Sequence, residues 1–167
     1  MRSMSGRFGL VLVVLFGLVN EGYAGMFGFG KKYDVLLFPE VSGKVVQNGA
    51  PVEGLKIIRS ATYDKNETQE TYTNAEGVFS FPSWSIRSST PGKAFVEDRL
   101  RQVIAAERGN EKFVLWYYVT GSTSGEQVIQ EKLGNLNCDL DDEELVHHFK
   151  IFENPDFTHN IASICRW

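Results

Sequence analysis

The sequence predicts an all-β protein, an antiparallel β-sandwich of about seven or eight strands with one disulfide. Three observations carry this prediction. Residues 42–82 contain four short runs rich in β-branched and aromatic residues, separated by turn residues at close, regular spacing. Residues 113–119 alternate apolar side chains at strict period two, as a strand with two distinct faces does. The third observation is a pair of cysteines, Cys138 and Cys165.

The first corner of the predicted sandwich lies between residues 44 and 63. Lys44, Val45 and Val46 form a strand-favouring run, and the dipeptide Asn48-Gly49 follows it. Both residues of that dipeptide tolerate positive φ, which predicts a tight turn. Residues 55–63 then read as the second strand, mostly buried on one face.

The second corner closes the four-strand unit. Residues 68–73 are rich in Thr and Tyr and predict the third strand. The turn at residues 74–77 ends in Gly77, at a position that favours positive φ. Residues 78–81 alternate as the fourth strand, which ends at Pro82 because proline cannot continue a central strand.

Both corners resemble the repeat of the carboxypeptidase regulatory-like, or transthyretin-like, β-sandwich, an Ig-like arrangement. Residues 135–140 and Ile164-Cys165 are in addition similar to one uncharacterised bacterial family of small exported proteins with this core. The resemblance implies a non-catalytic sandwich that positions or binds another molecule, and it carries over no active-site residues. The residues that carry the resemblance at the corners are Gly43, Gly49, Pro51, Val52, Gly54, Thr73, Asn74, Gly77, Phe79 and Phe81.

The N-terminal segment, residues 1–24, has the pattern of a cleavable signal peptide. Arg2 and Arg7 precede an apolar run at residues 8–19, and small residues around Ala24 offer a cleavage site. The run is too short to span a bilayer comfortably, although retention as a short anchor stays open as an alternative. We therefore expect a periplasmic or secreted protein with no stable membrane insertion after signal removal.

The rest of the chain is expected to form a leader with a lead-in strand (residues 25–41) and one β-sandwich domain (residues 42–167). The whole chain has a net charge of −4 at pH 7, without a basic cluster. This mild acidity argues against nucleic acid and against an anionic membrane surface as partners. Another periplasmic or envelope protein is the expected partner.

Cys138 and Cys165 predict a disulfide, because an even number of cysteines in an oxidising compartment usually pairs. Buried free thiols or a metal site are the alternatives. The acidic run at residues 139–144 lacks the spacing of a calcium loop. The neighbours His147 and His148 would point to opposite sides of a strand, and His159 has no supporting spacing. No metal and no cofactor are predicted.

Two segments are ambiguous in type. Residues 101–107 suit an amphipathic helix by spacing, but the strong strand after them favours a hairpin and hence a strand. Residues 128–133 form a short element of undefined type. Residues 135–140 and 161–167 are expected to be strands that bring the two cysteines together.

Trp116 and Tyr118 alternate with the apolar positions of the strand at residues 113–119 and are therefore expected on its opposite face. With Trp84 they form the candidate binding surface. The alternatives are a central strand covered on both faces, and a Trp84 that caps the open end of the core. The predicted core comprises Val45, Ile57, Phe79, Phe81, Phe113 and Leu115.

The sequence contains no recognisable catalytic set. Gly121-Ser-Thr-Ser-Gly125 has Thr where a hydrolase would place its nucleophile. Both cysteines are expected in the bridge. The predicted function is therefore a non-enzymatic, protein-binding or accessory module. Two alternatives are a periplasmic immunity-type inhibitor of a delivered toxin and a carbohydrate-binding module, the latter requiring that Trp116 and Tyr118 are exposed.

Overall fold

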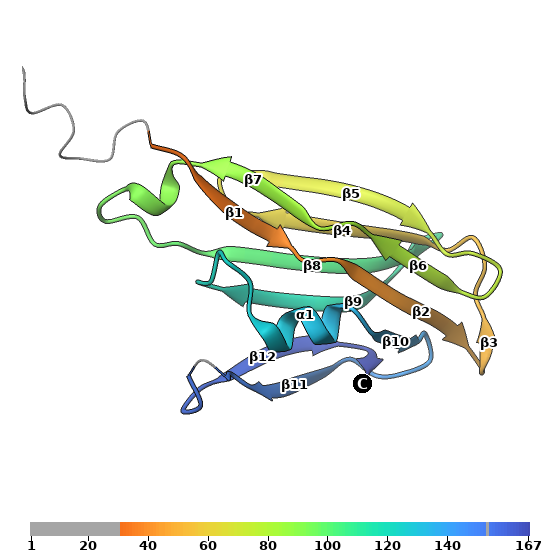
Figure 1. Cartoon of the computed structure of the whole chain (residues 1–167). Helices are drawn as coiled ribbons and strands as arrows, with labels where there is room; N and C mark the ends of the chain where they lie inside the picture. The colour runs from red at the N-terminus through yellow and green to blue at the C-terminus, as the bar shows by residue number, and fades with distance from the viewer. Residues whose placement is uncertain (1–30, 153) are drawn as a thin grey trace, which may run out of the picture.

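The computed structural model describes residues 31–152 and 154–167. This part of the chain is all-β, with one short α-helix and sheets arranged as a sandwich, which confirms the predicted fold class (Figure 1). Its 13 strands exceed the seven or eight expected, because several are short pieces of two to four residues. The predicted signal peptide (1–24) and the start of the predicted leader (25–30) lie outside the described residues. Within them, no helix is long and apolar enough to cross a membrane.

The larger layer is a six-stranded antiparallel sheet in the order β11-β12-β9-β8-β4-β5. β8 pairs with β4 over residues 101–107 and with β9 over residues 100–108, so the ambiguous residues 101–107 are a strand, as favoured. The strands of this sheet are β4 (Lys56–Thr62), β5 (Asn66–Tyr72), β8 (Leu100–Arg108), β9 (Glu111–Thr120), β11 (Leu145–Lys150) and β12 (Thr158–Ser163).

The second layer consists of two smaller sheets. One pairs β1 (Tyr33–Phe38) with β7 (Trp84–Ser88), and the other has the order β13-β10-β2-β3, with β6 also paired to β2. β10 runs parallel to β2, which makes it the exception to the antiparallel pattern among the described strands. The remaining strands are β2 (Val41–Gln47), β3 (Ala50–Pro51), β6 (Val78–Phe81), β10 (Leu136–Asp139) and β13 (Cys165–Arg166).

The chain passes from one small sheet to the other at Pro39, between β1 and β2. The element of undefined type at residues 128–133 is the helix α1 (Gln127–Leu133), which buries Val128, Ile129 and Leu133. The helix contacts β2, and Figure 1 shows it between β9 and β12 in this view. The Ser42 hydroxyl on β2 donates a hydrogen bond to the Gly134 carbonyl at the end of α1, 2.5 Å away.

Both predicted corners form as expected. Asn48 and Gly49 have φ angles of 51° and 74° and make the two-residue turn that joins β2 to β3. Gly77 has a φ of 74°, and a Cβ atom at this position would lie 2.3 Å from the Val45 carbonyl oxygen. Glycine is therefore required there by both conformation and space.

The threonine and asparagine of the second corner fix its backbone. The buried Thr73 hydroxyl accepts a hydrogen bond from the Leu55 amide (2.8 Å) and donates one to the Val52 carbonyl (2.6 Å). The Asn74 carboxamide oxygen accepts from the backbone amides of Glu76 (3.1 Å) and Val78 (2.8 Å). This side chain satisfies amides that would otherwise lack partners in the turn.

The core lies between the layers and contains five of the six predicted residues. Phe113 is the exception, because it is half-buried at the edge of the core. The fully buried members of the predicted set are Val45, Ile57, Phe79, Phe81 and Leu115.

One charged side chain, Arg59 of β4, lies fully buried in this core. Its guanidinium donates to the Gln69 side-chain oxygen and to the Pro82 carbonyl (2.7 Å). Its carbon Cζ lies 4.7 Å from the ring centroid of Phe81 and 5.2 Å from that of Trp84. Burial lowers the pKa of Arg59 to about 10. The group stays charged at neutral pH and is held by neutral acceptors and aromatic faces.

Replacing Gln69 by leucine is expected to lower the free energy of unfolding by about 2 kcal/mol, because the buried guanidinium loses the acceptor of two of its donors. Thr68→Leu, one residue earlier and exposed on the other face of β5, is the matched control. Denaturant unfolding of both variants checks this expectation. Equal midpoints would show that Gln69 does not stabilise the buried charge.

A β-bulge interrupts the pairing of β8 with β9. Ile104 pairs with Trp116 and Ala105 with Val114, so Leu115 is the extra residue. Leu115 and Trp116 are therefore both buried, and the inward side of β9 changes from odd to even positions at this point. The strict alternation seen in the sequence thus does not describe one continuous face.

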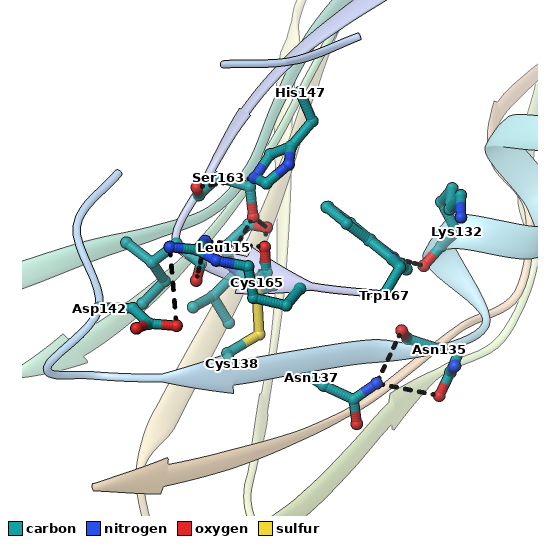
Figure 2. Close-up of a disulfide and its surroundings, with 12 residues drawn as sticks. Leu115, Lys132, Asn135, Asn137, Cys138, Asp142, His147, Ser163, Cys165 and Trp167 are labelled. Carbon is teal, nitrogen blue, oxygen red and sulfur yellow. Dashed lines mark hydrogen bonds and ion pairs between the residues drawn. A yellow bond between two sulfur atoms is a disulfide. The ribbon is translucent and has the colours of Figure 1, made fainter. Parts of the chain in front are cut away.

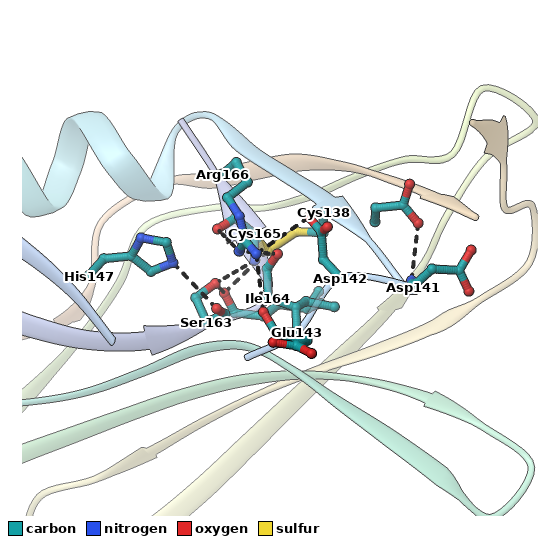
Figure 3. A network of polar contacts seen from close by, with 11 residues as sticks. Cys138, Asp141, Asp142, Glu143, His147, Ser163, Ile164, Cys165 and Arg166 are labelled. Carbon is teal, nitrogen blue, oxygen red and sulfur yellow. Dashed lines mark hydrogen bonds and ion pairs between the residues drawn. A yellow bond between two sulfur atoms is a disulfide. The ribbon is translucent and has the colours of Figure 1, made fainter. Parts of the chain in front are cut away.

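The predicted disulfide between Cys138 and Cys165 is present. The two residues are register partners on β10 and β13, and both are buried (Figure 2). The adjacent Arg166 donates to the backbone oxygens of Ile164 (2.7 Å) and Glu143 (3.1 Å), as Figure 3 shows. The bridge and this arginine together join the C-terminus to the acidic turn after β10.

Candidate functional site

The three residues of the predicted binding surface do not form a surface. Trp116 is completely buried and Tyr118 is 6% exposed, because the bulge turns both into the core. Trp84 is half-buried at the start of β7, where its ring stacks on Phe38 with the ring centroids 6.4 Å apart. The prediction that these three residues form an exposed aromatic face was therefore wrong. The alternative of a strand covered on both faces does not describe β9 either, because Tyr117 and Val119 on its other face are exposed.

Tyr118 instead lies beside a fork between β9 and β12. The register of these two strands contains a single pair, Ala162 with Tyr117. Beyond this pair, β9 continues to Thr120 and β12 extends back to Thr158 without registered partners across the gap. A hollow of about 400 Å³ occupies this fork. It is large enough for a small ligand or an amino-acid side chain.

The hollow has a polar base and a partly apolar rim. Hydroxyl and carboxamide groups line it on both strands, and the exposed Phe157 contributes an aromatic ring at the rim. The described residues around it are Tyr118, Val119, Thr120, Gly121, Ser122, Glu126, Ile151, Asn154, Phe157, Thr158, His159 and Asn160.

At the base of the hollow, four side chains form a hydrogen-bonded cluster. The Tyr118 hydroxyl lies 2.5 Å from Nδ1 of His159 and 3.3 Å from Oε2 of Glu126. The Thr120 hydroxyl lies 3.4 Å from the same carboxylate oxygen. The His159 side chain is completely buried and that of Glu126 is 16% exposed. The cluster thus places a nearly buried carboxylate at the edge of the core.

The tyrosine of this cluster remains a donor at neutral pH. Burial is the main cause that raises the pKa of Tyr118 to about 12; the hydrogen bond with Thr120 acts in the opposite direction, and the charge of Glu126 adds to the rise. The Tyr118 hydroxyl donates to Oε2 of Glu126 at 3.3 Å and also lies 2.5 Å from Nδ1 of His159, whose role as donor or acceptor depends on the tautomer of the ring.

Sequence reasoning missed the fork because its two sides come from distant segments. The sequence predicts Tyr118 as a contact residue, suggests His159 only as a metal ligand and does not single out Glu126. The signal present in the sequence was the Gly/Ser/Thr loop directly before Glu126. The near absence of β9–β12 pairing is a tertiary property that no local pattern encodes.

The other candidate polar clusters have structural roles. The Asp141 carboxylate accepts from Nε2 of Gln47 and from the Asn48 amide, both at 3.0 Å. His147 and His148 occupy opposite faces of β11, as expected for neighbours on a strand. Among the described residues, no group of three or more His, Cys, Asp or Glu side chains is placed to hold a metal ion.

The outer face of the six-stranded sheet carries an apolar stripe with two exposed and two half-buried members, which we call the Tyr117 stripe: Val103, Tyr117, Val146 and Ala162. Register pairing places these four residues side by side on β8, β9, β11 and β12. Tyr117 is 43% and Val146 56% exposed, and Val119, 40% exposed, continues the apolar surface from Tyr117 to the fork.

A family model described as a domain of unknown function, DUF6795, matches residues 41–143, more than half of the chain. The chain belongs to the DUF6795 family. The match runs from β2 through β10, so in this DUF6795 protein it includes Tyr118 and Glu126 on one side of the fork. His159 and β12 on the other side lie beyond it. Comparisons with curated proteins and with solved structures gave no match.

Proposed function

We propose that this DUF6795 protein is an exported, non-enzymatic β-sandwich module that docks another periplasmic or envelope protein through the Tyr117 stripe. The observation that carries the proposal is a row of adjacent apolar side chains across four strands of one sheet, in which Tyr117 and Val146 are exposed and Val103 and Ala162 are half-buried. Water-exposed apolar groups gathered on one face are typical of protein-binding surfaces. The proposed partner presents a complementary apolar patch.

Two features support export. The N-terminal pattern at residues 1–24 is that of a signal peptide. The bond between Cys138 and Cys165 is of a kind that persists in oxidising compartments and is rare in the cytosol. The glycine-bearing corners at Gly49 and Gly77 support the further proposal of a carboxypeptidase regulatory-like, or transthyretin-like, core.

The carbohydrate-binding alternative is not proposed, because it required an open platform formed by Trp116 and Tyr118. Both side chains are buried, so no sugar ring can stack on them. The Tyr117 stripe has one exposed aromatic ring flanked by aliphatic side chains, an arrangement that suits an apolar protein surface better than a polar glycan.

A comparison of two surface variants tests the docking proposal. Tyr117→Glu places a charge at the centre of the stripe and is expected to weaken partner binding by about tenfold or more. The matched control is Tyr72→Glu on β5, where the tyrosine is 57% exposed outside the stripe. Affinity purification from envelope extract with each variant and the unaltered protein identifies bound proteins, and titration with the purified partner measures affinity.

Retention of the same partner at the same affinity by Tyr117→Glu would refute docking through this face. Thermal unfolding of both variants separates lost binding from lost folding. A partner lost equally from Tyr72→Glu would also contradict the assignment, because that residue lies outside the stripe.

A further inference from the structure

We propose that the fork between β9 and β12 is a binding site for an organic cation, an ammonium or guanidinium group, with Glu126 as its counter-ion. This inference goes beyond docking through the Tyr117 stripe and does not depend on it. It follows from the charge, the hydrogen-bonding capacity and the shape of the hollow.

Charge is the first argument. Glu126 is the sole carboxylate among the described residues that line the hollow, and these include no lysine and no arginine. Its nearest basic group is Nδ1 of His159, 3.9 Å away, and that nitrogen faces the Tyr118 hydroxyl. A largely buried carboxylate with no lysine or arginine beside it among the described lining residues favours a ligand that brings a positive charge.

Hydrogen-bonding capacity is the second argument. A carboxylate offers about four lone-pair sites. The hydroxyls of Tyr118 and Thr120 donate long hydrogen bonds to Glu126, of 3.3 and 3.4 Å, and both reach the same oxygen, Oε2. An ammonium or guanidinium group in the hollow would fill the free sites with short, charge-assisted bonds.

Shape and surroundings complete the argument. The hollow of about 400 Å³ has Phe157, 61% exposed, at its rim, where an aromatic face can attract a cation. The hydroxyl and carboxamide groups of Ser122, Thr158 and Asn160 provide neutral acceptors for further N–H groups. Val119 lies between the fork and the apolar outer face and would contact the alkyl part of the ligand.

Titration of the purified, isotope-labelled protein with ethylguanidinium and butylammonium, followed by NMR amide shifts, tests the proposal. We expect saturable shifts that centre on residues 118–121 and 158–160. N-ethylurea, a neutral probe of nearly the same shape as ethylguanidinium, is expected to produce no saturable shift. Glu126→Gln keeps the side-chain shape and is expected to weaken cation binding by about tenfold.

The matched control is Glu131→Gln on α1, where the exposed carboxylate accepts a hydrogen bond from the Gln127 carboxamide. This variant should bind the cations as the unaltered protein does. Cation binding that is unchanged in Glu126→Gln, equal binding of N-ethylurea, or shifts that never saturate would each overturn the proposal. Acetyl-Val-Arg-Val-amide distinguishes the source of the cation. Tighter binding than ethylguanidinium supports a basic side chain of a partner, whereas equal binding supports a free small cation.

Discussion

Replacing Trp116 by alanine is expected to lower the free energy of unfolding by about 4 kcal/mol, the largest effect of any substitution we consider. The indole is completely buried and packs edge-on against Tyr118 and Trp167, with ring centroids 6.1 and 6.2 Å away. Truncation would leave a large cavity where the two layers meet the C-terminus. It would also remove the donor to the buried Gln102, whose side-chain oxygen lies 3.4 Å from the indole nitrogen.

The matched control is the next residue, Tyr117→Ala, which removes an aromatic ring from the exposed face of the same strand. We expect this variant to lose less than about 1 kcal/mol, because little apolar area leaves the protein interior. Denaturant unfolding followed by far-UV circular dichroism measures both. Equal losses in the two variants, or a larger loss for Tyr117→Ala, would contradict the bulge that turns Trp116 inward.

This pair of residues also shows the limit of sequence reasoning. The alternation of residues 113, 115, 117 and 119 predicts one apolar face, and that face is real as far as Leu115. The bulge then inserts one residue, and the inward positions become 116 and 118. Neither residue at the bulge differs from an ordinary strand former, so the bulge depends on tertiary packing and not on a local signal.

The corners were predictable for the opposite reason. Asn48-Gly49 and Gly77 each meet a local backbone requirement, a positive φ, that few other residues satisfy. It was also predictable that residues 101–107 form a strand and not a helix, because they must pair with the strong strand that follows after a short turn. Long-range pairing was not: β10 meets β2 in parallel, although about 90 residues separate Leu136 from Gly43.

The candidate sites divide in the same way. The disulfide could be predicted from residue type and compartment alone. The fork could not, because Glu126 and His159 meet only through the folding of β9 and β12, and the exposure of Tyr117 depends on the bulge. The two proposed binding surfaces therefore depend on strand register, which a single sequence does not display.

Removing the disulfide by the double substitution Cys138→Ala and Cys165→Ala is expected to lower the free energy of unfolding by about 3 kcal/mol. The cysteines are 27 residues apart, and closing a loop of this length restricts the unfolded chain by about that amount in the chain-entropy model. The thermal midpoint should fall by about 10 °C. Differential scanning calorimetry measures it.

The loss should be greatest at the C-terminus, because β13 contains only two residues and is held to β10 by the bridge and a short ladder. Hydrogen exchange is therefore expected to rise first at the backbone amides of positions 165 and 166. The indole nitrogen of Trp167 donates to the Lys132 carbonyl at 2.8 Å, and this side chain should also become mobile (Figure 2). Strands β4 and β8, which pair on both sides in the other layer, should keep their protection.

Reduction of the unaltered protein is the control for this double variant. A reductant should lower the thermal midpoint of the unaltered protein to that of the double variant. It should leave the midpoint of the double variant unchanged, because that variant has no disulfide to reduce. An unaltered protein whose midpoint does not respond to a reductant under unfolding conditions would contradict a stabilising bridge. Rapid exchange throughout β4 and β8 in the double variant would instead mean that the bridge holds both layers, and not only the C-terminal strand.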